Sequence, residues 1–150
     1  MYSKKEASLL REQFWTAFGM YMAPIMNADG EKINWINYKT GQKNIRFVME
    51  AGTTAAYIAI ELAHKDAGMQ QEYFKKLSSF KKAFKKIVSE DWQWELSAHL
   101  PDGQVVSRIF YQLNNVNLFD KNDWPALISF FKQRIIALDE FWSEYKFALE

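Results

Sequence analysis

The feature that most constrains the fold is a β-hairpin signal over residues 91–113. The segments DWQWELSAHL and VVSRIFYQL alternate apolar and polar residues, and the turn sequence PDGQ joins them. Alternation with period two is typical of strands, and a connection this short forces the two strands to run antiparallel. Pairing Leu100 with Val105 predicts that Trp94 lies opposite Tyr111 on one face of the sheet.

The first half of the chain carries the same alternation. The segments KINWINY, NIRFVMEA and AAYIAIELAH predict three further strands at residues 32–38, 44–51 and 55–64, joined by short turns. These neighbours must also be antiparallel. If the apolar side chains of 44–51 and 55–64 share one face, Arg46 lies opposite or diagonal to Glu61, which predicts a cross-strand ion pair.

Helical patterns surround these strands. Ser3 and Glu6 form a capping box at the start of a first helix, which Pro24 helps to end, and an apolar stripe predicts a second helix over residues 70–89. The last helix carries a seam spaced three and four residues apart: Ile128, Phe131, Ile135, Leu138, Trp142, Tyr145 and Leu149. Such spacing is typical of a helix packed on two sides, either inside its own core or against another subunit.

The predicted order of elements is α-β-β-β-α-β-β-α. This order favours an α+β fold, with an antiparallel five-stranded sheet and helices packed mainly on one of its faces. The chain of 150 residues has the length of one domain, so we expect a single domain over residues 1–150. Aromatic residues make up 17% of the chain, which predicts a thick core and some aromatic surface left for a partner.

Composition and charge exclude several classes of function. Without cysteine the chain has no disulfide framework, thiolate nucleophile or zinc–thiolate site, and its net charge of +1 gives no global attraction to nucleic acid or acidic lipid. The sequence shows neither an apolar signal segment nor a run of the ~20 apolar residues that a membrane helix needs. We therefore expect a cytoplasmic protein with no membrane partner and no cofactor.

The stretch IAIELAHKD, residues 58–66, places a glutamate, a histidine and an aspartate close together, as a metal site would. Strand geometry argues against a metal. Alternation puts His64 on the face opposite Glu61, and Glu50 on the preceding strand is displaced by roughly four residues of ~3.3 Å each. We predict no metal site, but a Glu61 paired with Arg46 and a His64 at a strand end. A degenerate nuclease or metal site is the alternative.

The less apolar face of the predicted sheet collects side chains that could bind a ligand. They are Trp35, Arg46, Tyr57 and Glu61 in the first half of the chain and Arg108 on the second hairpin. An arginine between aromatic rings either seals a contact between helix and sheet through cation–π contacts or lines a groove for a planar or anionic ligand. A small-molecule enzyme built around Trp35, Arg46 and Glu61 is a further hypothesis.

The second predicted helix is basic on its outer side. The segment YFKKLSSFKKAFKKI carries Lys75, Lys76, Lys81, Lys82, Lys85 and Lys86 around an apolar stripe. Such a face can meet the phosphates of nucleic acid, and the same pattern is also typical of a helix that only faces water. No glycine-rich phosphate loop, nucleophile elbow or Ser/His/Asp arrangement accompanies it.

Several segments resemble the bacterial domain of unknown function family DUF4268. They are REQFWTAFGMYM, INWINYKTG, IRFVMEAG, DWQWEL, SRIFYQL and DWPALISFFKQRIIALDEFW, and they extend over nearly the whole chain. The most telling positions are Phe14-Trp15, Trp94-Glu95, Ser107-Arg108-Ile109 and Trp124. The resemblance implies no established activity. Some relatives carry this domain behind a nuclease-like region, which implies nucleic-acid biology by association only, and this sequence lacks that region.

The predicted order helix, three strands, helix, strand is also similar to restriction-endonuclease-like folds. Those nucleases use an acid on one strand and a Glu-x-Lys motif on the next, whereas here Ala63 stands two residues after Glu61. Two functions follow as hypotheses. The first is a non-catalytic interaction domain that forms a homodimer through its C-terminal helix. The second is a nucleic-acid-associated protein with an incomplete or lost catalytic site, which binds through the lysines of the second helix.

Overall fold

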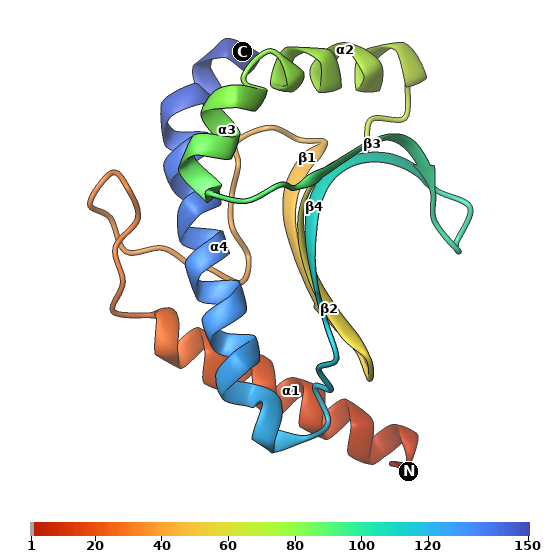
Figure 1. Ribbon diagram of the computed structural model, residues 1–150, viewed down its shortest axis with the longest axis vertical. Coiled ribbons are helices and arrows are strands. Elements are labelled where there is room, and N and C mark those ends of the chain that lie inside the picture. The colour runs from red at the N-terminus through yellow and green to blue at the C-terminus, as the bar shows by residue number, and fades with distance from the viewer. Residues whose placement is uncertain (1) are drawn as a thin grey trace.

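The computed structural model describes residues 2–150 and confirms the α+β class (Figure 1). The elements are α1 (Lys4–Met22), β1 (Ile45–Ala51), β2 (Ala55–Leu62), α2 (Ala67–Ser78), α3 (Lys81–Val88), β3 (Gln93–His99), β4 (Val105–Asn114) and α4 (Trp124–Tyr145), with short 3-10 helices at Lys121–Asp123 and Lys146–Leu149. Helices α3 and α4 lie on one side of a curved sheet, α2 crosses its upper end, and α1 runs across its lower end (Figure 1). No helix within this range is both long and apolar enough to span a bilayer.

The sheet formed by residues 2–150 has four strands rather than the five predicted, in the order β1-β2-β4-β3, and every neighbouring pair is antiparallel. The missing strand was predicted at residues 32–38, where the chain forms a loop. There Asn34 Oδ1 accepts hydrogen bonds from the backbone N–H groups of Ile36 and Asn37, at 3.1 and 3.2 Å. Such a side-chain turn competes with strand pairing, so the apolar alternation has a different cause: Trp35 is buried in the core.

The register of the first hairpin agrees with the prediction, and that of the second does not. β1 and β2 pair in one unbroken register with Arg46 opposite Glu61, as predicted. In the second hairpin Trp94 pairs with Ile109, two residues from its predicted partner. One residue of this difference arises at the turn, where Val105 pairs with His99 instead of Leu100, and the other arises where β3 shifts its register between Glu95 and Ala98. A residue with φ of 56°, Ser97, lies at the shift, and an inserted residue of this kind is a β-bulge.

The predicted helix over residues 70–89 is two helices. α2 ends before Ser79, and α3 begins after Phe80. At the break the Ser79 hydroxyl donates to the carbonyl of Lys76 at 2.6 Å. A serine that bonds back to a carbonyl competes with the helical ladder, so α3 leaves in a new direction (Figure 1).

Helix α4 uses its apolar seam inside the molecule. The side chains of Phe131, Ile135 and Leu138 are fully buried, and Trp142 is only 2% exposed. The indole N–H of Trp142 donates to the carbonyl of Thr40 at 2.7 Å, which ties the helix to the chain before β1. Most of the seam therefore packs in the helix's own core, and only its members Ile128 and Tyr145 are half-buried.

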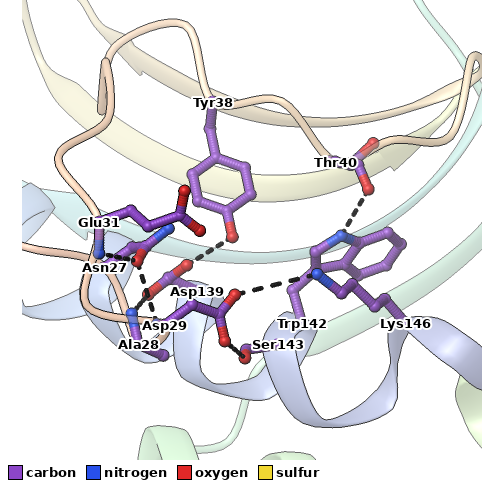
Figure 2. A network of polar contacts seen from close by, with 10 residues as sticks. All are labelled: Asn27, Ala28, Asp29, Glu31, Tyr38, Thr40, Asp139, Trp142, Ser143 and Lys146. Carbon is purple, nitrogen blue, oxygen red and sulfur yellow. Dashed lines mark hydrogen bonds and ion pairs between the residues drawn. The ribbon is translucent and has the colours of Figure 1, made fainter.

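A buried carboxylate fastens the loop before β1 to α4 (Figure 2). Asp139 is 3% exposed and accepts hydrogen bonds from the Tyr38 hydroxyl at 2.5 Å and from the backbone N–H of Ala28 at 2.7 Å. Burial, together with the Asp139 carboxylate, raises the pKa of Tyr38, so this hydroxyl keeps its proton. The loop is thus held by side chains rather than by a strand ladder.

Candidate functional site

A cleft between α3 and the start of β3 brings predicted lysines next to aromatic side chains. Helix α3 is followed by its C-cap residue Ser89, whose left-handed backbone (φ 58°) turns the chain back towards β3. The cleft has a volume of about 670 Å³ and is lined by Ser78, Ser79, Lys81, Lys82, Phe84, Lys85, Glu90, Asp91, Trp92 and Trp94. Its walls therefore come from the end of α2, from α3 and from the approach to β3.

Aromatic packing forms the floor of this cleft. Phe84 and Trp92 are buried, and their rings meet edge to face with centroids 5.2 Å apart. Phe84 also meets Trp94 edge to face at 5.7 Å, and Phe74 of α2 packs on Trp94 at 5.9 Å. Trp94 itself is half-buried. Its indole ring is thus held in place by two phenylalanines while part of its surface stays open.

Both acids of the lining are already paired. Asp91 Oδ1 forms an ion pair with Lys85 Nζ at a distance of 2.8 Å. The carboxylate of Glu90 binds Arg134 of α4 and accepts a hydrogen bond from the indole N–H of Trp92 at 3.1 Å. Because these donors hold Glu90, the arrangement is structural rather than that of a free general base.

Two lysines of α3 remain uncompensated in the cleft. Lys81 Nζ lies over the ring of Trp94, 5.0 Å from its centroid. Within residues 2–150 neither Lys81 nor Lys82 has a carboxylate at ion-pair distance. The hydroxyls of Ser78 and Ser79 donate to backbone carbonyls of α2, so the ammonium groups are the donors left for an anion.

The six predicted lysines do not form one face. Lys75 and Lys76 belong to α2, while Lys86 lies on α3 outside the cleft lining. Lys76 Nζ lies over the ring of Tyr73 at 5.1 Å. Prediction from sequence found the three lysines of the cleft but missed its two tryptophans, although the sequence WQW follows the basic segment closely.

Four of the five predicted sheet residues alternate along their strands with core side chains such as Ile45, Ile58 and Ile109, and so they lie on the opposite face of the sheet. Arg46, Glu61, Arg108 and Glu95 are successive register partners across β1, β2, β4 and β3. Arg46 Nε donates to Glu61 Oε1 at 2.9 Å, which confirms the predicted pair, and Arg108 Nη2 lies 3.4 Å from Glu95 Oε1. The row alternates in sign, so its charges compensate one another.

Aromatic rings flank this row at Arg108. Its guanidinium carbon lies 4.3 Å from the ring centroid of Phe110 and 6.0 Å from that of Tyr57. Burial, with the carboxylates of Glu50 and Glu61, raises the pKa of Tyr57. These contacts favour the cation–π interpretation of the face over the ligand groove.

Trp35 does not belong to this face. It is 2% exposed, and its indole N–H donates to the carbonyl of Ile25 at 3.0 Å. Because residues 33–38 form a loop instead of a strand, the structure does not bring Trp35 to Arg46 and Glu61. The three side chains of the hypothetical small-molecule site therefore do not come together as predicted.

The polar side chains of the stretch IAIELAHKD make separate contacts and do not converge on one site. Glu61 belongs to the charged row, and the buried ring of His64 stacks on Tyr73 at 4.7 Å. Asp66 Oδ1 accepts a hydrogen bond from Met69 N–H at 2.9 Å and so caps α2. Within residues 2–150 no three histidine or acidic side chains lie close enough together to hold a metal ion.

A second cavity, of about 390 Å³, lies between the loop before β1 and the end of α4. Two of the charged groups in its lining, Asp29 and Lys146, lie close to each other (Figure 2). Asp29 accepts a hydrogen bond from the Ser143 hydroxyl at 2.9 Å and lies 4.0 Å from Lys146 Nζ. The lysine-lined cleft is larger and combines two uncompensated ammonium groups with a half-buried indole ring, so it is the stronger candidate for binding.

Comparison with known proteins identifies a family without an assigned activity. Neither the curated proteins nor the solved structures contain a significant match. The family model described as a domain of unknown function matches residues 10–146, a range that includes the whole sheet and the cleft. The chain therefore belongs to the DUF4268 family.

Proposed function

We propose that this protein is a non-catalytic binding domain that recognises single-stranded nucleic acid through the cleft between α3 and β3. The observation that carries the proposal is the uncompensated ammonium of Lys81 over the half-buried ring of Trp94. Proteins that bind single strands combine cationic side chains, which attract phosphates, with aromatic rings on which bases stack. This cleft offers both kinds of group in one cavity.

Binding would exchange one partner of Trp94 for another. Lys81 would move from the indole ring to a phosphate, and an unpaired base would take its place on the ring. Lys82, on the same helix and in the same lining, supplies a second ammonium group. A stacked base contributes about 1–3 kcal/mol, whereas the phosphate contacts depend on salt. Bases in a duplex are already paired and stacked, so the cleft favours single strands.

Fluorescence anisotropy of a labelled oligonucleotide, single-stranded and duplex, at about 50 mM and about 200 mM salt tests this proposal. The variant Lys81→Glu/Lys82→Glu reverses the uncompensated charges of the cleft. Its matched control, Lys75→Glu/Lys86→Glu, makes the same charge change outside the lining. We expect the cleft variant to lose about tenfold or more in single-strand affinity, and the control to lose much less. If both variants lost the same affinity, the total charge of the protein and not the cleft would attract the strand. A wild type that binds no single strand at low salt would overturn the proposal.

Stacking is tested separately at Trp94. Trp94→Leu removes the aromatic face and should lower single-strand affinity about tenfold, whereas Trp94→Phe should retain most of it. Thermal unfolding of both variants shows whether the floor of the cleft has stayed folded. If Trp94→Leu stays folded and binds as tightly as the wild type, the base does not stack there.

Self-association is the second candidate function. Most of the α4 seam that predicted it is buried, which favours another surface for a homodimer. The observation that favours this candidate is β1, an edge strand with no strand on its outer side. Light scattering over a range of protein concentrations tests it. Both functions suit the cytoplasmic location that we expect for the protein.

A further inference from the structure

The two edges of the sheet differ in their protection against another strand. β3 carries a register shift beside Ser97, and a bulge discourages pairing at an edge. β1 pairs with β2 in one unbroken register from Ile45 to Ala51. It contains neither proline nor lysine, the residues that commonly block an edge. β1 is therefore the open edge of the sheet.

The hydrogen bonds at the ends of β1 show which of its residues face outwards. Gly52 N–H donates to the carbonyl of Ala55 at 2.9 Å, and Ala63 N–H donates to the carbonyl of Asn44 at 2.8 Å. In an antiparallel ladder the hydrogen-bonded residues alternate along each strand. The even-numbered residues of β1 therefore bond to β2, and the odd-numbered residues direct their backbone groups away from it.

Only part of this outer side is already in use. The N–H of Ile45 donates to the carbonyl of Gln42 at 3.3 Å, and its carbonyl accepts from the Thr40 hydroxyl at 2.6 Å. The outward N–H and C=O groups of Phe47 and Met49 take part in no such bond within residues 2–150. They form a short row of donors and acceptors that a second strand could satisfy.

We infer that β1 pairs with β1 of a second copy of this chain, antiparallel and around a twofold axis at Val48. In this register Phe47 exchanges backbone hydrogen bonds with Met49 of the partner subunit, and Arg46 lies opposite Glu50 of the partner subunit. The two sheets become one continuous sheet. The inference rests on the second candidate function and names its surface.

Charge complementarity selects this register. Arg46 and Glu50 are both exposed and flank Val48 symmetrically. A slip of two residues would place Arg46 opposite Val48 or Gly52 of the partner subunit, and a slip of four would bring like charges together. Arg46 can accept a second carboxylate because Glu61 engages its Nε and Nη2 atoms, which leaves Nη1 available.

A charge-swap experiment tests the pairing. Glu50→Arg brings arginines together across the axis, and Arg46→Glu brings glutamates together, so each variant alone should be monomeric by light scattering. The wild type should show twice the monomer mass at the same concentration. Mixed in equal amounts, the two variants regain opposite charges at every pair and should form a heterodimer. Glu31→Arg, the same charge change at an exposed residue outside β1, should keep the wild-type mass.

Arg46→Glu also places a like charge beside Glu61 and could impair folding, so a second variant tests the pairing without this change. Val48→Lys leaves that pair intact and should be monomeric with an unchanged unfolding temperature. Hydrogen exchange then locates the interface: the amides of Phe47 and Met49 should be protected in the wild type and exchange fast in Val48→Lys.

Two results would overturn the pairing of β1, and only one of them would also exclude self-association. A dimer that survives Val48→Lys, or in which the amides of Phe47 and Met49 exchange fast, keeps self-association but excludes this edge. A wild type that is monomeric at every concentration excludes both. Oligonucleotide affinity is measured independently, so neither result decides the nucleic-acid proposal.

Discussion

We expect one buried histidine, His64, to couple the stability of this protein to pH. The ring of His64 stacks on Tyr73, its side chain is 6% exposed, and its Nδ1 atom has no hydrogen-bond partner within residues 2–150. Burial disfavours the imidazolium form and lowers the pKa of His64 below its ordinary value of 6.5. The unfolded chain therefore binds a proton more readily than the folded one.

We expect the free energy of unfolding to be highest above about pH 6.5 and to fall below it, until the pH passes the lowered pKa of the folded state. His64→Phe keeps an aromatic stack on Tyr73 and removes the titrating group. Its stability should therefore fall less than that of the wild type between about pH 8 and about pH 5, measured by urea unfolding. His99→Phe, at an exposed position, is the control. Equal falls in the wild type and His64→Phe would show that other groups set the pH dependence.

Among the elements, the loop before β1 depends on one buried carboxylate. Asp139→Ala leaves the Tyr38 hydroxyl and the Ala28 N–H without an acceptor. Tyr38 is half-buried, so its unsatisfied hydroxyl costs about 1–3 kcal/mol, whereas the exposed Ala28 can donate its N–H to water. We therefore expect the free energy of unfolding to fall by about 1–3 kcal/mol in urea titrations. Ser143→Ala loses only an exposed bond and should cost about 0.5 kcal/mol or less. Similar losses in both variants would mean that Asp139 does not hold the loop.

Elements were predictable where their causes are local. The capping serine of α1 and the first hairpin follow from neighbours in sequence: Ser3 accepts from Glu6 N–H at 3.1 Å, and Arg46 lies opposite Glu61. The false strand has a non-local cause, because Trp35 is buried by tertiary packing while its neighbours form a side-chain turn. Periodicity alone cannot separate these two origins of apolar alternation.

For the molecule as a whole, contacts between segments distant in the sequence determine which site residues come together, and the sequence patterns did not predict those contacts. The lysines of the cleft were predicted as candidates for phosphate contact or as a face that only meets water, but the position of Lys81 over Trp94 depends on the break between α2 and α3 and on the turn at Ser89. Likewise β2 pairs with β4 across an intervening helical region, which places Arg108 opposite Glu61. Both sites combine residues whose proximity no single segment encodes.

The terminal helix shows why whole-molecule context changes the meaning of a variant. A heptad seam suggests that a charge at Leu138 would separate subunits, yet this side chain is fully buried in its own chain. An ionised carboxylate in the core costs several kcal/mol, so Leu138→Glu should abolish the cooperative thermal transition. Glu140→Lys, at an exposed position of the same helix, should leave both fold and mass unchanged. If Leu138→Glu instead kept the wild-type unfolding temperature and only halved the mass, the seam of α4 would be the subunit interface and β1 would not.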